Sequence, residues 1–334
     1  MENLTHTLVG LMMARAGLAK TTQRGAGMMM LAANMPDLDT VSWFGGTLTY
    51  IQYHRGDTHS LTFAPLIALI PMLLVRAGLN WRAYVASLLG VLSHLLLDWT
   101  NVYGIRLFLP FSDRWPHLDI TDIVDPWIWV ILLLALAAPW LSGLVSGEIS
   151  SKSTGAGNAN AGVKRAWAWF AILALLAFEG TRFITHQRAL DVMNARLYNG
   201  AVARRITALP GTFNPLRWRG VIEGDGFVRI APLDLRTDFD PAGGRVYYPA
   251  ATNGAITAAM HTRPFEVFGR FNQVPFLQVT KLSDATAGDA TRVQLIDLRF
   301  GTPEYPGFAT TAVVDASGRV LKSQFGLGGL PQPK

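Results

Sequence analysis

The sequence predicts an α-helical membrane bundle of four to six transmembrane helices, followed by a small, mostly-β domain. Half of the 334 residues are hydrophobic and only 16% are charged, against roughly 25% in soluble domains. The long apolar runs all lie before residue 186, and short β-rich pieces between Gly, Pro and Asp turns follow from about residue 215. We therefore divide the chain into a membrane-embedded domain (1–190), a connector (191–214) and an extramembrane β domain (215–334).

Four apolar runs approach the length that a helix needs to cross about 30 Å of hydrocarbon. They cover residues 61–75, 84–97, 127–145 and 166–178. Tryptophans such as Trp81, Trp99 and Trp140 lie at the ends of these runs, as in an interfacial aromatic belt. Two shorter runs, 8–19 and 25–35, would cross only if they pack against the other four.

The lysines and arginines of the short loops predict the orientation of the bundle. They are Lys20 and Arg24, Arg76 and Arg82, and Lys152, Lys164 and Arg165. In a six-segment bundle all of these loops lie on one side, which we expect to be cytoplasmic. The N-terminus, the loops 37–59 and 98–126, and everything after about residue 186 then lie outside the cytoplasm.

The net charge of +6 does not indicate a nucleic-acid partner, because the arginines of the second half are scattered rather than clustered with aromatic residues. The chain has no cysteine. This excludes disulfides, thiolate metal ligands and a cysteine nucleophile.

Ionisable side chains gather on the side of the bundle that we expect to be extracytoplasmic. They are His6, Asp37, Asp39, His54, His59, His94, Asp98, Asp119, Asp122 and Asp125. The loops on the other side are nearly bare of His and Asp. The asymmetry predicts one shared site, assembled at the ends of several helices.

Local spacing supports convergence of these residues. In SHLLLDW, His94 and Asp98 are four residues apart, so they lie about 40° from each other on one helical face. In NMPDLD the proline ends the preceding segment, and Asp37 and Asp39 would project to one side of an extended turn. In HRGDTHS the glycine permits a sharp turn beside His59.

Several histidines and carboxylates without sulfur form a ligand set that suits zinc first, then manganese or iron. Each residue also has an ordinary structural interpretation. His6 fits a helix interface, His94 and Asp98 fit a hydrogen-bonded pair, and Asp37 and Asp39 fit turn carboxylates. The combination of segments favours a divalent metal site.

At these residues the chain resembles the membrane-bound metal-dependent hydrolase family of bacteria and archaea named for YdjM, which includes YfhP-like proteins. The matching pieces are LTHTLVG (4–10), NMPDLD (34–39), HRGDTHS (54–60), SHLLLDWTNVYG (93–104), LPFSDRW (109–115), DIVDPWIW (122–129) and NPLRWRGVIE (214–223). The resemblance implies metal-binding positions at His6, Asp37, Asp39, His54, His59, His94, Asp98 and Asp125. It also implies a multi-pass protein of the inner (cytoplasmic) membrane.

We expect a hydrolase in which a metal-activated water attacks a phosphoester or ester of a lipid or lipid-linked substrate. Arg55 is the candidate for holding a substrate oxygen, and Asp119 is the candidate general acid or supporting base. The alternatives are a metal-binding transporter and a partner-binding scaffold. A transporter would place its ionisable residues near the bilayer midplane rather than at helix ends, which favours the enzyme.

Overall fold

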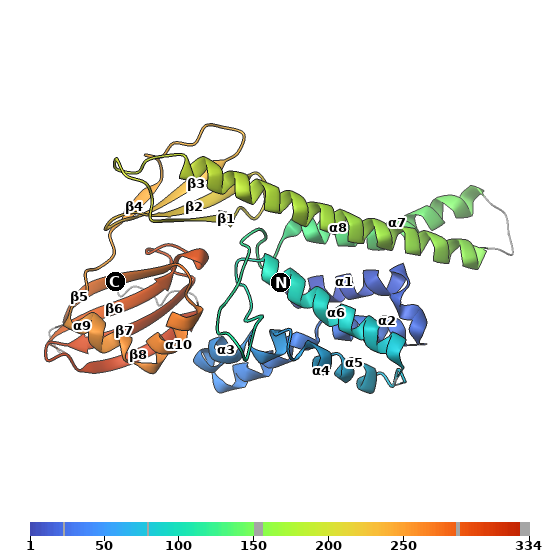
Figure 1. Cartoon of the computed structure of the whole chain (residues 1–334), viewed down its shortest axis with the longest axis horizontal. Coiled ribbons are helices and arrows are strands. Elements are labelled where there is room, and N and C mark those ends of the chain that lie inside the picture. The colour runs from blue at the N-terminus through green and yellow to red at the C-terminus, as the bar shows by residue number, and fades with distance from the viewer. Residues whose placement is uncertain (23, 79, 150–155, 285–287, 328–334) are drawn as a thin grey trace. The chain divides into compact units, whose positions relative to one another are not determined.

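A computed structural model describes residues 1–22, 24–78, 80–149, 156–284 and 288–327 (Figure 1). The chain forms two compact units. The first comprises Met1–Asp39, Arg55–Arg188 and Pro210–Arg217. The second comprises Thr40–His54, Ala189–Leu209 and Trp218–Lys334.

The first unit is built around three helices that pack on one another: α1 (Asn3–Ala16), α2 (Gly25–Ala32) and α6 (Trp81–Thr100). Two glycines permit this packing. A Cβ on Gly10 would come within 2.7 Å of the Met29 carbonyl oxygen, and one on Gly90 within 2.8 Å of the Ala32 side chain. The missing side chains therefore let α1 and α6 approach α2 closely, as small residues do between membrane helices.

Shorter elements connect these helices. After α1 come η1 (Leu18–Thr21), then α2 and the 3-10 helix η2 (Met35–Gly45). Next come α3 (Thr47–Tyr53), η3 (Asp57–His59), α4 (Ala64–Ile67) and α5 (Leu69–Leu74). After α6, an irregular segment leads to α7 (Pro126–Ile149), and α8 (Ala156–Asn194) is a single long helix.

Among the described residues, two helices are long and apolar enough to cross a membrane: α6 and the part of α8 from Ala161 to Asn194. The bent pair Thr47–His59 and Ala64–Leu74 passes the same test jointly and would make a third. The helical N-terminal region thus has two or three candidate spans, and four to six are not established. The runs 84–97 and 166–178 lie within the two qualifying helices.

Four of the expected segments take shorter or broken forms. The run 61–75 is divided between α4 and α5 rather than forming one helix. The runs 8–19 and 25–35 form α1 and α2, which end at Ala16 and Ala32. The run 127–145 lies in α7, whose stretch Pro126–Leu141 is apolar but short.

The second unit contains two four-stranded sheets, which confirms the mostly-β character expected of the C-terminal part. The first has β1 (Arg205–Pro210), β2 (Arg217–Glu223), β3 (Val228–Asp234) and β4 (Arg245–Tyr247), in that order. The second has β5 (Pro275–Asp284), β6 (Gly288–Asp297), β7 (Phe308–Asp315) and β8 (Val320–Leu327), all paired antiparallel. The stretch 191–214, expected as a connector, contains β1.

The second sheet packs against two helices, α9 (Gly254–Met260) and α10 (Arg263–Phe271). Phe265, Phe268 and Phe271 recur every three residues along α10 and are almost completely buried. Helix α3 also belongs to this unit, where it contacts α10 and β8. Residues 40–54 therefore leave the first unit and return to it at Arg55, immediately before the motif residues 57–59.

Candidate metal centre

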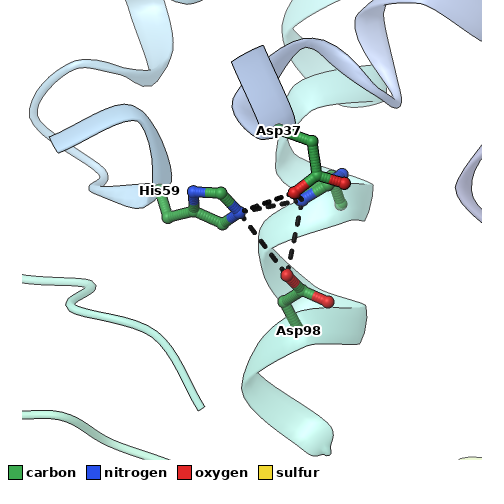
Figure 2. A group of neighbouring side chains, drawn as sticks. Asp37, His59 and Asp98 are labelled. Carbon is green, nitrogen blue, oxygen red and sulfur yellow. Dashed lines mark hydrogen bonds and ion pairs between the residues drawn. The ribbon is translucent and has the colours of Figure 1, made fainter. Parts of the chain in front are cut away.

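Four of the predicted ligands converge in the first unit: Asp37 from η2, His59 from η3, and His94 and Asp98 from α6 (Figure 2). All four are buried, and one donor atom from each lies within 4.8 Å of the others. His94 and Asp98 share a face of α6, as their four-residue spacing predicts. The other two come from short 3-10 helices that approach that face.

Asp37 and Asp39 both contact His59 from η2, which is a 3-10 helix rather than the extended turn expected from the sequence. Asp37 Oδ1 lies 3.4 Å from His59 Nε2, and Asp39 Oδ2 lies 3.1 Å from His59 Nδ1. The two carboxylates therefore contact different nitrogens of one imidazole ring, while an oxygen of one also lies within 4.8 Å of an oxygen of the other.

The centre of the group is formed by the two Nε2 atoms and the carboxylates of Asp37 and Asp98. His94 Nε2 lies 3.1 Å from His59 Nε2, 3.6 Å from Asp37 Oδ1 and 3.4 Å from Asp98 Oδ2. His59 Nε2 lies 3.5 Å from Asp98 Oδ2. Figure 2 shows the His59 ring and both carboxylates directed toward this common point.

Hydrogen bonds at the outer ring nitrogens assign the tautomers of both histidines. His94 Nδ1 donates to the Ala33 carbonyl oxygen at 2.7 Å, so its lone pair is on Nε2. His59 Nδ1 lies between Asp39 Oδ2 and the Thr58 hydroxyl oxygen, both at 3.1 Å, and the Thr58 hydroxyl itself donates to Asp39 Oδ2. In the neutral ring, donation from Nδ1 to Asp39 leaves the lone pair of His59 on Nε2.

This assignment places two imidazole lone pairs 3.1 Å apart and beside two carboxylate oxygens. Acceptors that face each other in a buried site repel, because neither supplies a hydrogen to the other. A divalent cation among them would convert the repulsion into four favourable contacts. Two nitrogen and two oxygen donors fit zinc, and also manganese or iron.

Asp37 is suited to remain ionised in this position. Burial by itself would raise the pKa of its carboxyl group. The neighbouring side chains of His59, His94 and Arg55 outweigh burial and bring the pKa below its usual range. An ionised carboxylate is the form that binds a metal.

His6 lies on the edge of the group. It is fully buried, its Nε2 is 3.4 Å from Asp98 Oδ1, and its ring stacks on His94 with 3.7 Å between ring centroids. Burial, followed by the nearby positive groups, holds the pKa of His6 well below its ordinary value. Its ring is therefore neutral and retains a lone pair, although it is outside the set of four mutually close donors.

Arg55 and Asn101 position Asp98. The Nε of Arg55 lies 3.2 Å from Asp98 Oδ2, while its Nη1 donates to Asn101 Oδ1 and to the Gly104 carbonyl oxygen. Asn101 Nδ2 donates to Asp98 Oδ1 at 3.2 Å, and the amine of Met1 also contacts that oxygen. Arg55 is 3% exposed, so these contacts describe a positioning residue, and its role toward a substrate stays a prediction.

Three further predicted site residues also lie outside the set of four. His54 belongs to the second unit, where it follows α3 and its ring stacks on Tyr50 at 4.4 Å. Asp125 caps α7 by accepting from the Trp127 backbone N–H, and burial raises its pKa. Asp119 pairs with His117 Nδ1 at 2.8 Å. Neither of these aspartates is in the set of four, and their chemical roles stay predictions.

Two contributors were missed in the sequence. Asn101 follows Asp98 by three residues, a helical spacing that places both near one face and that was available as a signal. The Ala33 carbonyl oxygen had no such signal. A backbone oxygen is present at every residue, and only the packing of α2 against α6 selects this one.

With this geometry in view, comparison with known proteins is informative. The model of the family described as YdjM inner membrane protein matches residues 1–188, more than half of the chain. The chain belongs to this family. The matched region contains every residue of the metal group, whereas most of the second unit lies beyond it.

Two curated relatives are similar over parts of the chain. YfhP of Bacillus subtilis (strain 168) is 32% identical over 118 residues, which are 34% of this chain and 36% of YfhP. Inner membrane protein YbcI of Escherichia coli (strain K12) is 29% identical over 135 residues, 35% of this chain and 76% of YbcI. The match thus spans about a third of YfhP. No solved structure matches.

Proposed function

We propose that this family member is a membrane-bound metal-dependent hydrolase. Its substrate is a phosphoester or ester of a lipid or lipid-linked molecule, and water is the nucleophile. The observation that carries the proposal is the pair of imidazole Nε2 atoms, 3.1 Å apart, that face each other beside two carboxylates. This arrangement supports a metal centre, because in neutral rings with Nδ1 donating outward neither Nε2 supplies a hydrogen to the other.

Asp37, His59, His94 and Asp98 would hold the ion. A bound divalent ion supplies Lewis acidity and lowers the pKa of water toward neutrality. Asp39 accepts from His59 Nδ1 and so fixes the ring with Nε2 directed inward. The Ala33 carbonyl oxygen does the same for His94. Arg55 and Asn101 hold the Asp98 carboxylate in place and balance its charge.

The first test is the metal content of the detergent-purified full chain. We expect bound zinc, manganese or iron in the wild type, and loss of most of it in Asp98→Asn and His59→Ala. Asp57→Asn is the matched control for the first variant, because Asp57 is an exposed carboxylate of the same motif. His261→Ala is the control for the second, because His261 is exposed in the second unit. Wild-type metal content in all four variants would refute the metal centre.

The second test is turnover on a panel of phosphoesters and esters. We expect activity that disappears with a chelator and returns with zinc or manganese. Chelator-insensitive activity would remove the metal from the mechanism. Metal binding without turnover on any substrate would favour the transporter or scaffold.

The proposal includes a bundle of four to six crossings with the metal group and the second unit outside the cytoplasm. The chain has no native cysteine, so single cysteines can report the topology. A cysteine at the exposed position Lys164 should react with a membrane-impermeant reagent only after lysis. One at the exposed position Ser317 should react when only the outer envelope is permeable. The reverse pattern would move the chemistry to the cytoplasm.

A further inference from the structure

An apolar groove of about 660 Å³ lies between α1, α6 and α8 in the first unit. Its volume falls within the roughly 300–1,000 Å³ of small-molecule sites. Val9, Leu97 and Ala16 line it and are nearly fully buried, whereas Leu96 and Leu176 are 47% and 55% exposed. The groove therefore has an apolar floor and partly exposed apolar walls.

One stripe of α1 connects the groove with the metal group. His6, which lies against Asp98, is followed on the same helical face by Val9, Met13 and Ala16, all within about 80° of arc. Those three residues line the groove. The stripe thus begins at the metal group and continues along the groove wall.

Helix α6 makes the same connection. Leu97 and Thr100, which line the groove, flank Asp98 in the sequence. The groove-lining residues Ser93 and Leu89 continue from Leu97 toward the other end of the helix. One end of the groove therefore adjoins the metal group, and the groove extends away from it along α6.

The far end is closed by Arg165, whose Nε donates to the Ala16 carbonyl oxygen at 3.0 Å. Glu179, also in the lining, marks the near end on α8. The fourteen steps along the helix from Arg165 to Glu179 correspond to about 21 Å. Between them the α8 wall consists of Trp169, Ile172, Leu175 and Leu176, so the groove is long and apolar.

We infer that this groove binds one alkyl chain of a membrane lipid whose phosphate-bearing head group lies at the metal group. The inference rests on the proposed function and specifies its substrate class. An alkyl chain matches a wall that is apolar apart from Ser93 between its polar ends. The groove lies between α6 and α8, which are long and apolar enough to span a membrane, so it would be accessible to lipid chains.

The test uses phosphatidic acid with a photoreactive diazirine in one acyl chain, added to the purified full chain. We expect labelling of peptides from α1 and α8 that saturates and that excess unlabelled phosphatidic acid prevents. Ile172→Trp, which fills the groove, should lower the apparent affinity about tenfold, equivalent to two methylenes losing their buried contacts. Leu173→Trp is the matched control, because Leu173 is exposed on α8 and does not line the groove.

Labelling that does not saturate, or that Ile172→Trp and Leu173→Trp change equally, would overturn the inference. If Ile172→Trp fails to fold, as judged by gel filtration and metal content, the wild-type labelling map decides alone. Saturable groove labelling in a protein that hydrolyses neither phosphoesters nor esters would refute the proposed function and keep the alkyl-chain site. Hydrolysis of a water-soluble phosphoester without saturable labelling would support the proposed function and overturn the alkyl-chain site.

Discussion

The two units each bury a group of charged side chains, but with opposite hydrogen-bond chemistry. In the second unit, Asp297 and Arg299 form a fully buried ion pair with 2.7 Å between Arg299 Nη2 and Asp297 Oδ2. In the first unit, Asp37, His59, His94 and Asp98 are buried at comparable depth. Burial of charge is common to both and therefore does not by itself mark a functional site.

The Asp297–Arg299 pair is matched donor to acceptor. Arg299 Nε and Nη2 donate to the carboxylate, and Nη2 also donates to the Phe271 carbonyl oxygen at 2.9 Å. The rings of Phe271 and Phe300 each lie 4.9 Å from the guanidinium. The charges of the pair are therefore balanced by groups within the chain.

The metal group has a different composition at its centre. His59 Nε2 and His94 Nε2 lie 3.1 Å apart beside two carboxylates, while their Nδ1 atoms contact Asp39 and the Ala33 carbonyl oxygen. The comparison teaches that the kind of buried atoms brought together, rather than burial itself, distinguishes a group that could hold a metal ion.

The largest effect is expected for a variant of the Asp297–Arg299 ion pair. Arg299→Met leaves a buried carboxylate without its partner and should lower the free energy of unfolding of the second unit by about 3–5 kcal/mol. Pulse proteolysis of the full chain in urea measures this. The double variant Asp297→Leu/Arg299→Met should recover most of the loss. A single variant as stable as the wild type would show that the pair contributes little.

Removal of a bound metal ion should lower the stability of the first unit only. If the ion is supplied at about a hundred times its Kd, a chelator should lower the stability of the first unit by about 2.7 kcal/mol. Hydrogen exchange should rise in η2 and in the second half of α6 and remain unchanged in β5–β8. Equal exchange with and without chelator would mean that a proton, rather than a metal ion, lies between His59 Nε2 and His94 Nε2.

The orienting carboxylate should have a smaller effect than a ligand. Asp39→Asn keeps the shape but weakens the acceptor for His59 Nδ1, so metal affinity should fall about 10–100-fold without loss of stoichiometry. Titration with a competing chelator measures the affinity. Complete loss of metal would instead identify Asp39 as a direct ligand, as the sequence predicts.

The smallest effect is expected for an exposed pair. Arg204 and Asp225 lie 2.6 Å apart but are 69% and 87% exposed. Arg204→Ala should change the stability of the second unit by less than about 1 kcal/mol, because solvent screens the pair. A loss of stability comparable to that of Arg299→Met would contradict the expectation that an exposed ion pair contributes less to stability than a buried one.

Several features of the site were predictable from the sequence. Helical periodicity is local, so the spacing of His94 and Asp98 was enough to place them on one face of α6. The run of apolar residues likewise predicted α6 and α8, because hydrophobicity over about twenty residues is a property of the segment alone. The alternation of β-rich pieces and turns predicted the strands β2 to β8 of the second unit, but not β1, which lies in the expected connector.

The mutual arrangement of segments was not predictable in the same way. Asp37 and Asp39 looked equivalent, and only the tertiary structure shows that they contact different nitrogens of His59. Residues 61–75 read as one span, but the helix is divided into α4 and α5. Such choices depend on contacts with residues far away in the chain.

The sequence by itself determined the chemistry available to this protein: histidines and carboxylates without sulfur, concentrated at the ends of apolar segments. It also determined which residues share a helical face, because that follows from a fixed rotation per residue. Only the tertiary structure decided which of these side chains meet and which nitrogen of each histidine faces the centre. The physical reason is that Ala33, Asp39 and the groove beside α8 act through packing across long sequence separations, and packing is a property of the whole fold.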